Sequence, residues 1–301
     1  PEIWVSFNPE LDTDETYERF VVKKERFAPD YIQDEDTGKP IRYAIVKKVG
    51  WQDNKWFPAD MHYEMQVMKA ADEAKWLNVW EGHTKVVLEG SIYSNEIRNV
   101  LLDGRRTRVP YDPARPVHTF WDLGHSDKTA IWFIQTVGVE FNVINYYENR
   151  LQKIPFYIGI LQDFKYNYSI HNIPHDGDAE TVSNVTPRKQ LQDVGFRVRV
   201  IKAPSKKFVG INAARSVFPL CNFDEDNTSD GWKCLTRYCY KVDENGNFSS
   251  EPEHDTPWSH GADAFQTFAL SLKSETAAKK PRIVTPSFRS GVRHGGNNWM
   301  G

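Results

Sequence analysis

The segment VHTFWDLGHSDKTAIWFIQTVG, residues 117–138, decides which fold we expect for this chain. Two apolar runs, 117–123 and 129–137, flank a short polar loop, and a third run follows at 140–148 after the connection VGVE. Such short connections predict consecutive antiparallel strands. Asp122 lies inside the first run, directly after Phe120 and Trp121, where an uncompensated carboxylate is costly. The segment therefore raises the question of what balances the charge of Asp122.

Helical and strand patterns alternate after these three strands. We expect a helix at 154–168, a strand at 170–176, a short helix opened by Thr186 and Pro187, and a strand at 196–203. Further helices are expected at about 208–219, 229–238 and 259–273, the last with Ser259 as its N-cap. The predicted fold class is α/β, with a mixed sheet covered by helices.

Composition divides the rest of the chain. Residues 1–116 contain a predicted helix at 58–75 and end in a Pro- and Arg-rich linker, so we expect a domain boundary near 110–116. Residues 276–301 contain five basic residues, no acidic residue and no apolar periodicity, which predicts a disordered basic tail. This tail either keeps the chain soluble or contacts phosphates or a partner. The chain opens without Met, which favours a fragment or a processed chain.

Charge and cysteine content exclude several classes of protein. The net charge of −3 argues against a protein covered by nucleic acid. No apolar run approaches the roughly 20 residues of a membrane helix. The cysteines Cys221, Cys234 and Cys239 lack CxxC spacing, so we expect neither a zinc site nor a disulfide framework, and a reducing compartment.

Acidic residues stand where a mixed sheet brings its strand ends together. Asp122 ends the first strand, Asp176 is expected to end the fourth, and Asp263 to lie in the first turn of the final helix. Carboxylates in such a group hold the paired divalent cations that hydrolyse phosphodiesters, and Mg²⁺ and Mn²⁺ prefer oxygen ligands. We therefore predict that Asp122 bridges two cations and that Asp176 and Asp263 each hold one. Gly124 and Gly261 would let the backbone turn or approach closely beside them.

Each of these residues has a plainer alternative role. Asp176 and its neighbour Asp178, a further candidate metal ligand, are also typical turn formers or helix caps. Asp127 either joins the site or shapes the loop, and Asp263 also suits the positive end of a helix dipole. Three histidines near the acids are interpreted as structural or supporting groups rather than ligands: His118, His175 and His260.

The order WDLGHSDKTA, PHDGDAE and SHGADAFQTFA resembles the nuclease domain of the large terminase subunit of tailed bacteriophages, over nearly all of residues 117–273. The resemblance implies a ribonuclease H-like (retroviral-integrase-like) fold, with Asp122, Asp176 and Asp263 as its metal-binding carboxylates. A second acid often adjoins the last one in the family. Only alanines adjoin Asp263, so Asp255 or Asp127 is expected to supply that ligand. The long gap before Asp263 implies insertions around 222–230 and 241–256.

The first 116 residues fit the same resemblance. IWVSFNP, with Ser6 and Asn8, is similar to the motif that couples ATP hydrolysis in the motor domain. TYERFVV, GWQDNKWFP and WEGHTKVVLEGSIY are similar to the end of that domain and its linker. The phosphate-binding pattern GxxxxGK[ST] is absent from the sequence, so we expect no ATPase activity from this chain.

The resemblance implies a metal-dependent endonuclease that cuts concatemeric double-stranded viral DNA in the host cytoplasm, with little sequence preference. It also implies a portal protein and a small terminase subunit as partners, and an oligomer in the full motor. Lys128 would neutralise a phosphate or form a surface salt bridge. Arg197, Arg199 and Lys202 would follow the DNA backbone or line a solvated strand face. Two alternatives stay open: a recombinase or transposase of the same fold, and a non-catalytic portal-docking module.

Overall fold

The structure, a computed structural model, describes residues 6–11, 14–22, 32–33, 40–41, 47–85, 88–124, 127–178, 185–244, 246–254 and 256–278. Helix α9 (Ser259–Ala278) includes the first three residues of the predicted tail, and residues 279–301 lie outside the described part. Within that part, no helix is both long and apolar enough to cross a membrane.

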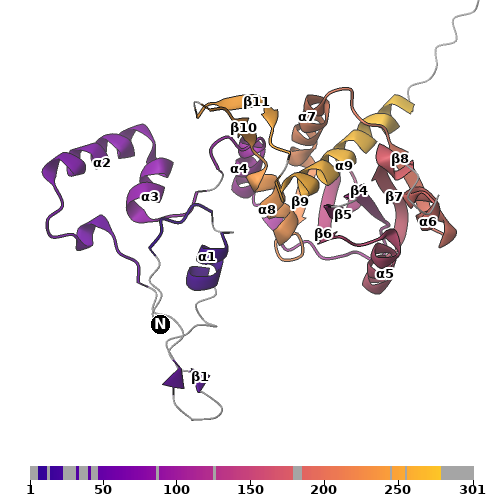
Figure 1. Cartoon of the computed structure of the whole chain (residues 1–301), viewed down its shortest axis with the longest axis horizontal. Helices are drawn as coiled ribbons and strands as arrows, with labels where there is room; N and C mark the ends of the chain where they lie inside the picture. The colour runs from indigo at the N-terminus through magenta and orange to yellow at the C-terminus, as the bar shows by residue number, and fades with distance from the viewer. Residues whose placement is uncertain are drawn as a thin grey trace, which may run out of the picture.

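A seven-stranded mixed sheet forms the centre of the molecule, in the order β3-β9-β6-β5-β4-β7-β8 (Figure 1). Strands β4, β5 and β6 are antiparallel neighbours, as expected for the three apolar runs, whereas β7, β8, β9 and β3 join in parallel. Three antiparallel strands continued by two parallel ones, β6-β5-β4-β7-β8, is the arrangement expected of a ribonuclease H-like fold, which is thereby confirmed. The strands are β3 (Arg106–Thr107), β4 (Val117–Asp122), β5 (Lys128–Val137), β6 (Glu140–Arg150), β7 (Tyr168–Pro174), β8 (Arg197–Ile201) and β9 (Cys221–Asp224).

Helices cover both faces of this sheet because side chains along a strand alternate between its faces. Phe120 belongs to the larger core, together with residues of α4 (Ser94–Leu102), α7 (Lys207–Val217), α8 (Ser229–Arg237) and α9. Trp121 belongs to the smaller core, under α5 (Ile154–Phe164) and α6 (Pro187–Asp193). The alternation puts Asp122 on the same side as Phe120, facing α9.

Two predicted element boundaries differ, each for a local reason. The helix expected at 154–168 ends at Phe164, because Lys165 adopts a left-handed conformation (φ 54°) that closes it. The strand expected at 170–176 ends at Pro174, so Asp176 follows it in the 3₁₀ turn η4 (His175–Asp178).

The start of the last helix also differs from the prediction. Helix α9 begins at Ser259 itself, whose hydroxyl donates to His254 O (2.8 Å) and Thr256 O (2.9 Å). Ser259 is therefore its first residue rather than its N-cap. Asp263 consequently lies just beyond the first turn.

The region between Asp176 and Asp263 contains a strand that the sequence did not predict. Residues 221–224 form β9, which pairs in parallel with β6, so part of the expected insertion at 222–230 completes the main sheet. The short η5 (Phe218–Leu220) precedes β9. The region 241–256 holds most of a hairpin outside the main sheet, β10 (Tyr240–Val242) and β11 (Phe248–Pro252).

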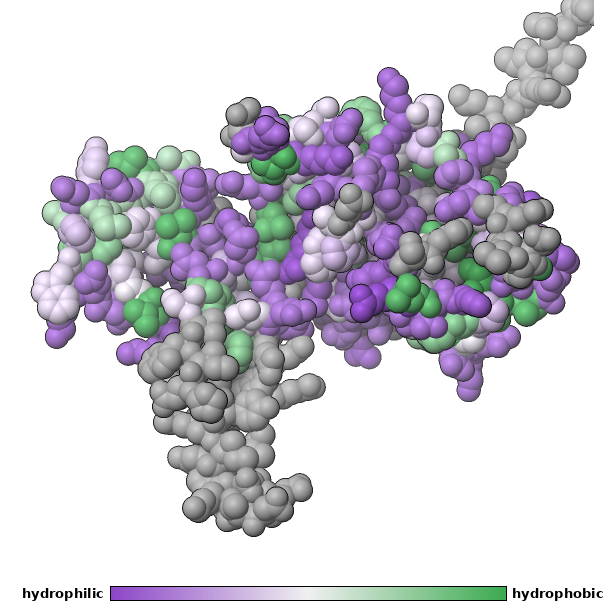
Figure 2. Space-filling model, in the orientation of Figure 1, coloured by the Kyte–Doolittle hydropathy of each residue, from purple (hydrophilic) through white to green (hydrophobic). Residues whose placement is uncertain are grey.

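The N-terminal region is built differently. It contains α1 (Glu15–Tyr17), η1 (Glu18–Val22), β1 (Ile32–Gln33), β2 (Pro40–Ile41), η3 (Trp51–Asp53), α2 (Ala59–Ala71) and α3 (Glu73–Glu81). The single helix expected at 58–75 divides because Asp72 Oδ1 accepts a hydrogen bond from Lys75 N (3.0 Å) and starts α3. Hydrophobic side chains are scattered over the surface around α2 and α3 (Figure 2).

The main core begins earlier in the chain than the predicted boundary at 110–116. Ile92, Tyr93, Ile97 and Val100 are buried in the larger core, and β3 extends the sheet beside β9. The segment from Ile92 therefore packs with the sheet, whereas α2 and α3 lie apart from it (Figure 1).

Candidate active site

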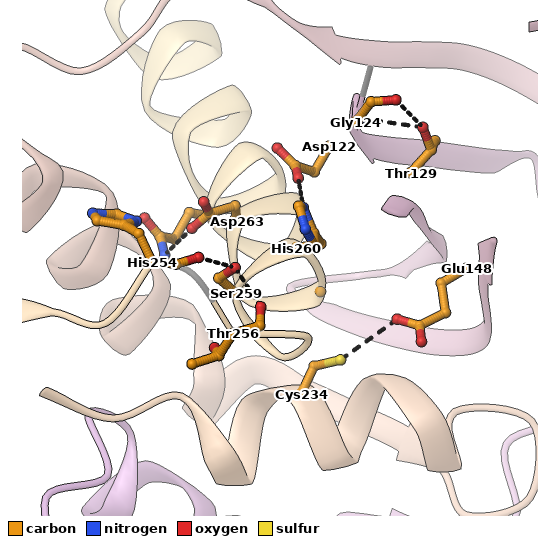
Figure 3. A network of polar contacts seen from close by, with 12 residues as sticks. Asp122, Gly124, Thr129, Glu148, Cys234, His254, Thr256, Ser259, His260 and Asp263 are labelled. Atoms are coloured by element: carbon orange, nitrogen blue, oxygen red, sulfur yellow. Dashed lines mark hydrogen bonds and ion pairs between the residues drawn. The ribbon is translucent and has the colours of Figure 1, made fainter. Parts of the chain in front are cut away.

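Asp122 ends β4 with its carboxylate pointing toward α9. Its Oδ2 lies 3.0 Å from Nδ1 of His260, which is in the first turn of α9 (Figure 3). Burial raises the pKa of Asp122 to about 6, and the nearby Asp263 also raises it, while the His260 contact acts in the opposite direction. The hydrogen bond with Asp122 in turn raises the pKa of His260. His260 thus provides the partner that the burial of Asp122 requires.

Asp263 lies one turn further along α9, and both its oxygens are engaged. Oδ2 lies 2.6 Å from Nζ of Lys207, the first residue of α7, and Oδ1 accepts a hydrogen bond from Gln266 Nε2 (3.1 Å). The Asp263 side chain is only 23% exposed. Asp122 and Asp263 therefore form one acidic site, called the corner below, between the end of β4 and the start of α9. His260 is the partner of Asp122, and Lys207 is the partner of Asp263.

Two glycines let the backbone close around this corner. A Cβ at Gly261 would meet Cys234 Sγ at 2.7 Å and Tyr146 Oη at 2.8 Å, and Gly261 O accepts a hydrogen bond from Trp132 Nε1 (2.8 Å). A Cβ at Gly124 would lie 2.3 Å from Lys128 O, where the chain turns from β4 toward β5. Both positions require glycine, as the sequence predicted for a close approach.

Asp176 lies at the same edge of the sheet, two residues beyond β7. Thr119 and His171 are in register across parallel β4 and β7, so counting forward puts Asp122 level with Pro174. Asp176 Oδ1 is buried and has no hydrogen-bond partner among the described residues. Its neighbour Asp178 forms an exposed ion pair with Arg188 (3.4 Å).

A fourth acid, Glu148, was not anticipated. It lies on β6 opposite Ala130 of β5, which in turn lies opposite Asp122 of β4. Side chains opposite one another across a sheet share a face, so Glu148 and Asp122 both face α8 and α9. Glu148 is 18% exposed, forms an ion pair with Lys128 and accepts a hydrogen bond from Tyr146 Oη (2.7 Å).

A β-bulge explains why the sequence did not reveal Glu148. Simple counting back from the turn, where Val137 pairs with Glu140, would put Tyr147 opposite Ala130. The register shifts by one between Phe133 and Ile134, and Glu148 takes that place. The signal available in the sequence was only an acid at the end of an apolar strand.

The remaining predicted residues lie in other settings. Lys128 forms the salt bridge that was its alternative role. Asp127 is exposed, and Asp255 lies outside the described residues. On the edge strand β8, Arg197 is exposed and Arg199 half-buried, and Lys202 is exposed just after it. Ser6 and Asn8 are both exposed.

The donor atoms suit a hard cation, although no cluster is assembled. Asp122, Asp176 and Asp263 supply only oxygen atoms, the ligands that Mg²⁺ and Mn²⁺ prefer. The partnerless oxygen of Asp176 and the raised pKa of Asp122 are two features that a bound cation would relieve. Within the described ranges, however, no three His, Cys, Asp or Glu side chains are arranged to hold a metal ion. Among these residues the structure brings Asp122 and Asp263 together and does not assemble the predicted three-acid cluster.

Comparisons with known proteins give distant structural likenesses. No family model and no curated protein matches the chain. It is similar to the large terminase of a thermophilic bacteriophage, at 12% identity and a TM-score of 0.46, over 88% of this chain and 62% of that one. It is also similar to the g2p large terminase nuclease domain of bacteriophage SPP1 with bound Mn, at 15% identity and a TM-score of 0.42, over 56% and 96%.

A third similar structure is the large terminase nuclease of the thermophilic phage G20c with bound magnesium, at 11% identity and a TM-score of 0.43, over 61% of this chain and 98% of that one. All three are large terminases. The chain spans 62% of the length of the first of them. The ribonuclease H-like fold follows from the strand order β6-β5-β4-β7-β8 and not from these likenesses.

Proposed function

We propose that this chain is a metal-dependent endonuclease of the large-terminase type, which hydrolyses double-stranded viral DNA during genome packaging. The observation that carries the proposal is the corner formed by Asp122 and Asp263. A central strand and the last helix bring together two largely buried carboxylates, and the charge of Asp263 helps to raise the pKa of Asp122. Such an arrangement is costly to maintain for structural purposes alone.

Asp122, Asp263 and Asp176 are the residues that would hold Mg²⁺ or Mn²⁺. When bound, two such cations supply a hydroxide near neutral pH and neutralise charge on the leaving oxygen. His260 holds the Asp122 carboxylate in position through its 3.0 Å contact, and Gln266 does the same for Asp263. Exposed Arg197 and Lys202, with Arg199 beside them, would contact phosphates without reading bases, so the sequence preference would be low.

We also propose roles for the N-terminal region and for partner proteins. Residues 1–116 would be the end of a motor domain and its linker, the part from Ile92 packing with the sheet, and Ser6 and Asn8 would lie in the coupling segment. The chain itself would not hydrolyse ATP. A portal protein and a small terminase subunit would be its partners in an oligomeric motor, acting in the host cytoplasm.

Plasmid cleavage tests the proposal. Purified protein is incubated with supercoiled plasmid in Mn²⁺, Mg²⁺ or EDTA, beside Asp122→Asn and the control Asp163→Asn on the exposed part of α5. We expect metal-dependent linearisation that Asp122→Asn lowers by about 10²–10³-fold, the scale seen when a transition-state-stabilising group is lost. Asp163→Asn should retain full activity.

Other outcomes identify the alternatives. Cleavage undiminished in Asp122→Asn would refute this active site. No cleavage and no Mn²⁺ binding by the unaltered protein would favour the portal-docking module. Strong preference for particular DNA ends or sequences would favour a recombinase or transposase.

A further inference from the structure

Lys207 is a cationic residue in contact with the acidic corner formed by Asp122 and Asp263. It is the first residue of α7, and its ammonium lies 2.6 Å from Asp263 Oδ2, with the two side chains 31% and 23% exposed. A charge-assisted hydrogen bond of this length, partly shielded from water, is stronger than an exposed ion pair. The contact therefore defines where the ammonium resides when no other cation is present.

The packing of α7 on α9 fixes this contact. One turn after Lys207, a Cβ at Gly210 would lie 2.6 Å from Gln266 Oε1, so the two helices approach closely there. Gln266 is buried and donates to the second oxygen of Asp263 (3.1 Å). The start of α7 is thereby held against the carboxylate, and Lys207 reaches Asp263 from a rigid element.

Lys207 also acts on the second acid of the corner. Asp263 disfavours ionisation of Asp122, while the Lys207 charge favours it. One ammonium therefore offsets the repulsion between two carboxylates that would otherwise destabilise the folded chain. A divalent cation on Asp263 would offset the same repulsion, so the ammonium and the cation compete for one role.

We propose that Lys207 is an internal counter-cation of this site: it neutralises Asp263 in the metal-free protein and must be displaced when a divalent cation binds there. This inference rests on the proposed function, because it assumes that Asp263 is a metal ligand. The consequence is that nuclease activity requires a higher concentration of divalent cation, because Lys207, a positioning residue and not a ligand, has to be displaced first.

Calorimetric titration with Mn²⁺ tests displacement directly, with Lys207→Met, Lys207→Arg and the matched control Lys206→Met. Lys206 is the exposed neighbour in sequence, and methionine keeps the packing of the stem while removing the charge. We expect Lys207→Met to bind Mn²⁺ roughly 3–10-fold more tightly, because no ion pair has to be broken. Lys206→Met and Lys207→Arg should remain within about twofold of the unaltered protein.

A double-mutant cycle in EDTA tests the counter-cation role without metal. Urea unfolding of Lys207→Met, Asp263→Asn and the double variant should show that Lys207→Met is destabilising only while Asp263 is charged. Equal destabilisation in both backgrounds would overturn the role. Mn²⁺ affinity that is unchanged or weaker in Lys207→Met would overturn displacement alone. An unaltered protein that neither binds Mn²⁺ nor cuts DNA would overturn displacement together with the proposed function, while the cycle would still decide the counter-cation role.

Discussion

The region around the sheet and the region before Ile92 contrast in how they bury apolar surface. Sheet and helices enclose two cores that contain large, almost fully buried side chains such as Trp121, Trp132 and Phe265. In the described residues up to Lys85, the buried large apolar side chains are Leu11, Met65 and Trp76. Since apolar burial is the main source of stability, the sheet region should fold largely by itself, and the N-terminal region should depend on contacts with it.

Those contacts concentrate on one helix. Arg237 of α8 forms a 2.5 Å ion pair with Asp14 and stacks on Trp258, which precedes α9 by one residue. Lys233 of the same helix pairs with Glu18 (3.4 Å). The described residues 14–22 are therefore attached at least in part through charges, whereas the sheet region is held together by apolar packing.

The largest expected effect comes from Trp132→Ala in the main core. Trp132 is fully buried, packs on Tyr146 and Phe265 with centroid distances of 4.6 and 5.7 Å, and donates to Gly261 O. Loss of the ring should lower the free energy of unfolding by about 3–5 kcal/mol, measured by urea denaturation. As control, Trp56→Ala removes a side chain that is 86% exposed and should change it by less than about 0.5 kcal/mol.

The second effect is an acid sensitivity of the sheet region. His171 is buried beside Phe196, its Nδ1 lies 2.7 Å from Thr119 Oγ1, and burial lowers its pKa to about 4, with a smaller contribution from His118. The pKa of His171 is lower in the folded than in the unfolded chain, so neutral His171 favours the folded state. This contribution to the free energy of unfolding is fully present above about pH 6.5 and is lost as pH falls toward 4. The loss should reach roughly 3 kcal/mol.

Urea unfolding of His171→Gln at several pH values measures this sensitivity. The variant should lose less stability than the unaltered protein between pH 6.5 and 4. Asp122 has the opposite effect, because its raised pKa of about 6 favours the folded state at lower pH. The pH dependence of the free energy of unfolding is therefore compared between the variant and the unaltered protein. His62→Gln, on an exposed part of α2, should keep the original sensitivity. Equal acid sensitivity in His171→Gln would contradict the assignment.

A smaller effect should follow from detaching the N-terminal segment. Arg237→Met keeps an apolar stem over Trp258 but removes the charge that holds Asp14. We expect the free energy of unfolding to fall by about 1–2 kcal/mol. The amide hydrogens of residues 14–22 should also exchange faster with solvent. Arg98→Met, on an exposed part of α4, serves as the control. Unchanged exchange in Arg237→Met would show that the segment is held by other contacts.

The smallest effect on overall unfolding is expected from Trp76→Ala, although Trp76 is a buried tryptophan. It lies in α3, where Lys69 Nζ sits 4.0 Å from the ring centroid, outside both main cores. Loss of the ring should loosen α2 and α3, seen as faster proteolysis there, and shift the main unfolding transition by less than about 0.5 kcal/mol. A shift as large as that of Trp132→Ala would refute the contrast between the regions.

Much of this arrangement was readable from local patterns. Apolar runs and short connections predicted β4, β5 and β6, and the position of an acid among aromatics singled out Asp122. Local sequence was less informative where an element is short or paired at long range. The residues of β9 gave no strand signal alone, and Asp72 divided the expected helix at 58–75 through a cap that propensity did not reveal.

The sequence by itself determined which residues could become buried strands and that Asp122 would need a partner, because the apolar runs and the desolvation cost of a carboxylate are local properties of the chain. Only the tertiary structure decided what that partner is. His260 reaches Asp122 because α9 lies against β4, and Lys207 reaches Asp263 because α7 packs closely on α9. A one-residue bulge in β6 decided that Glu148, and not Tyr147, faces the same side. Register and helix packing depend on the sum of distant contacts, and no short stretch of sequence contains that sum.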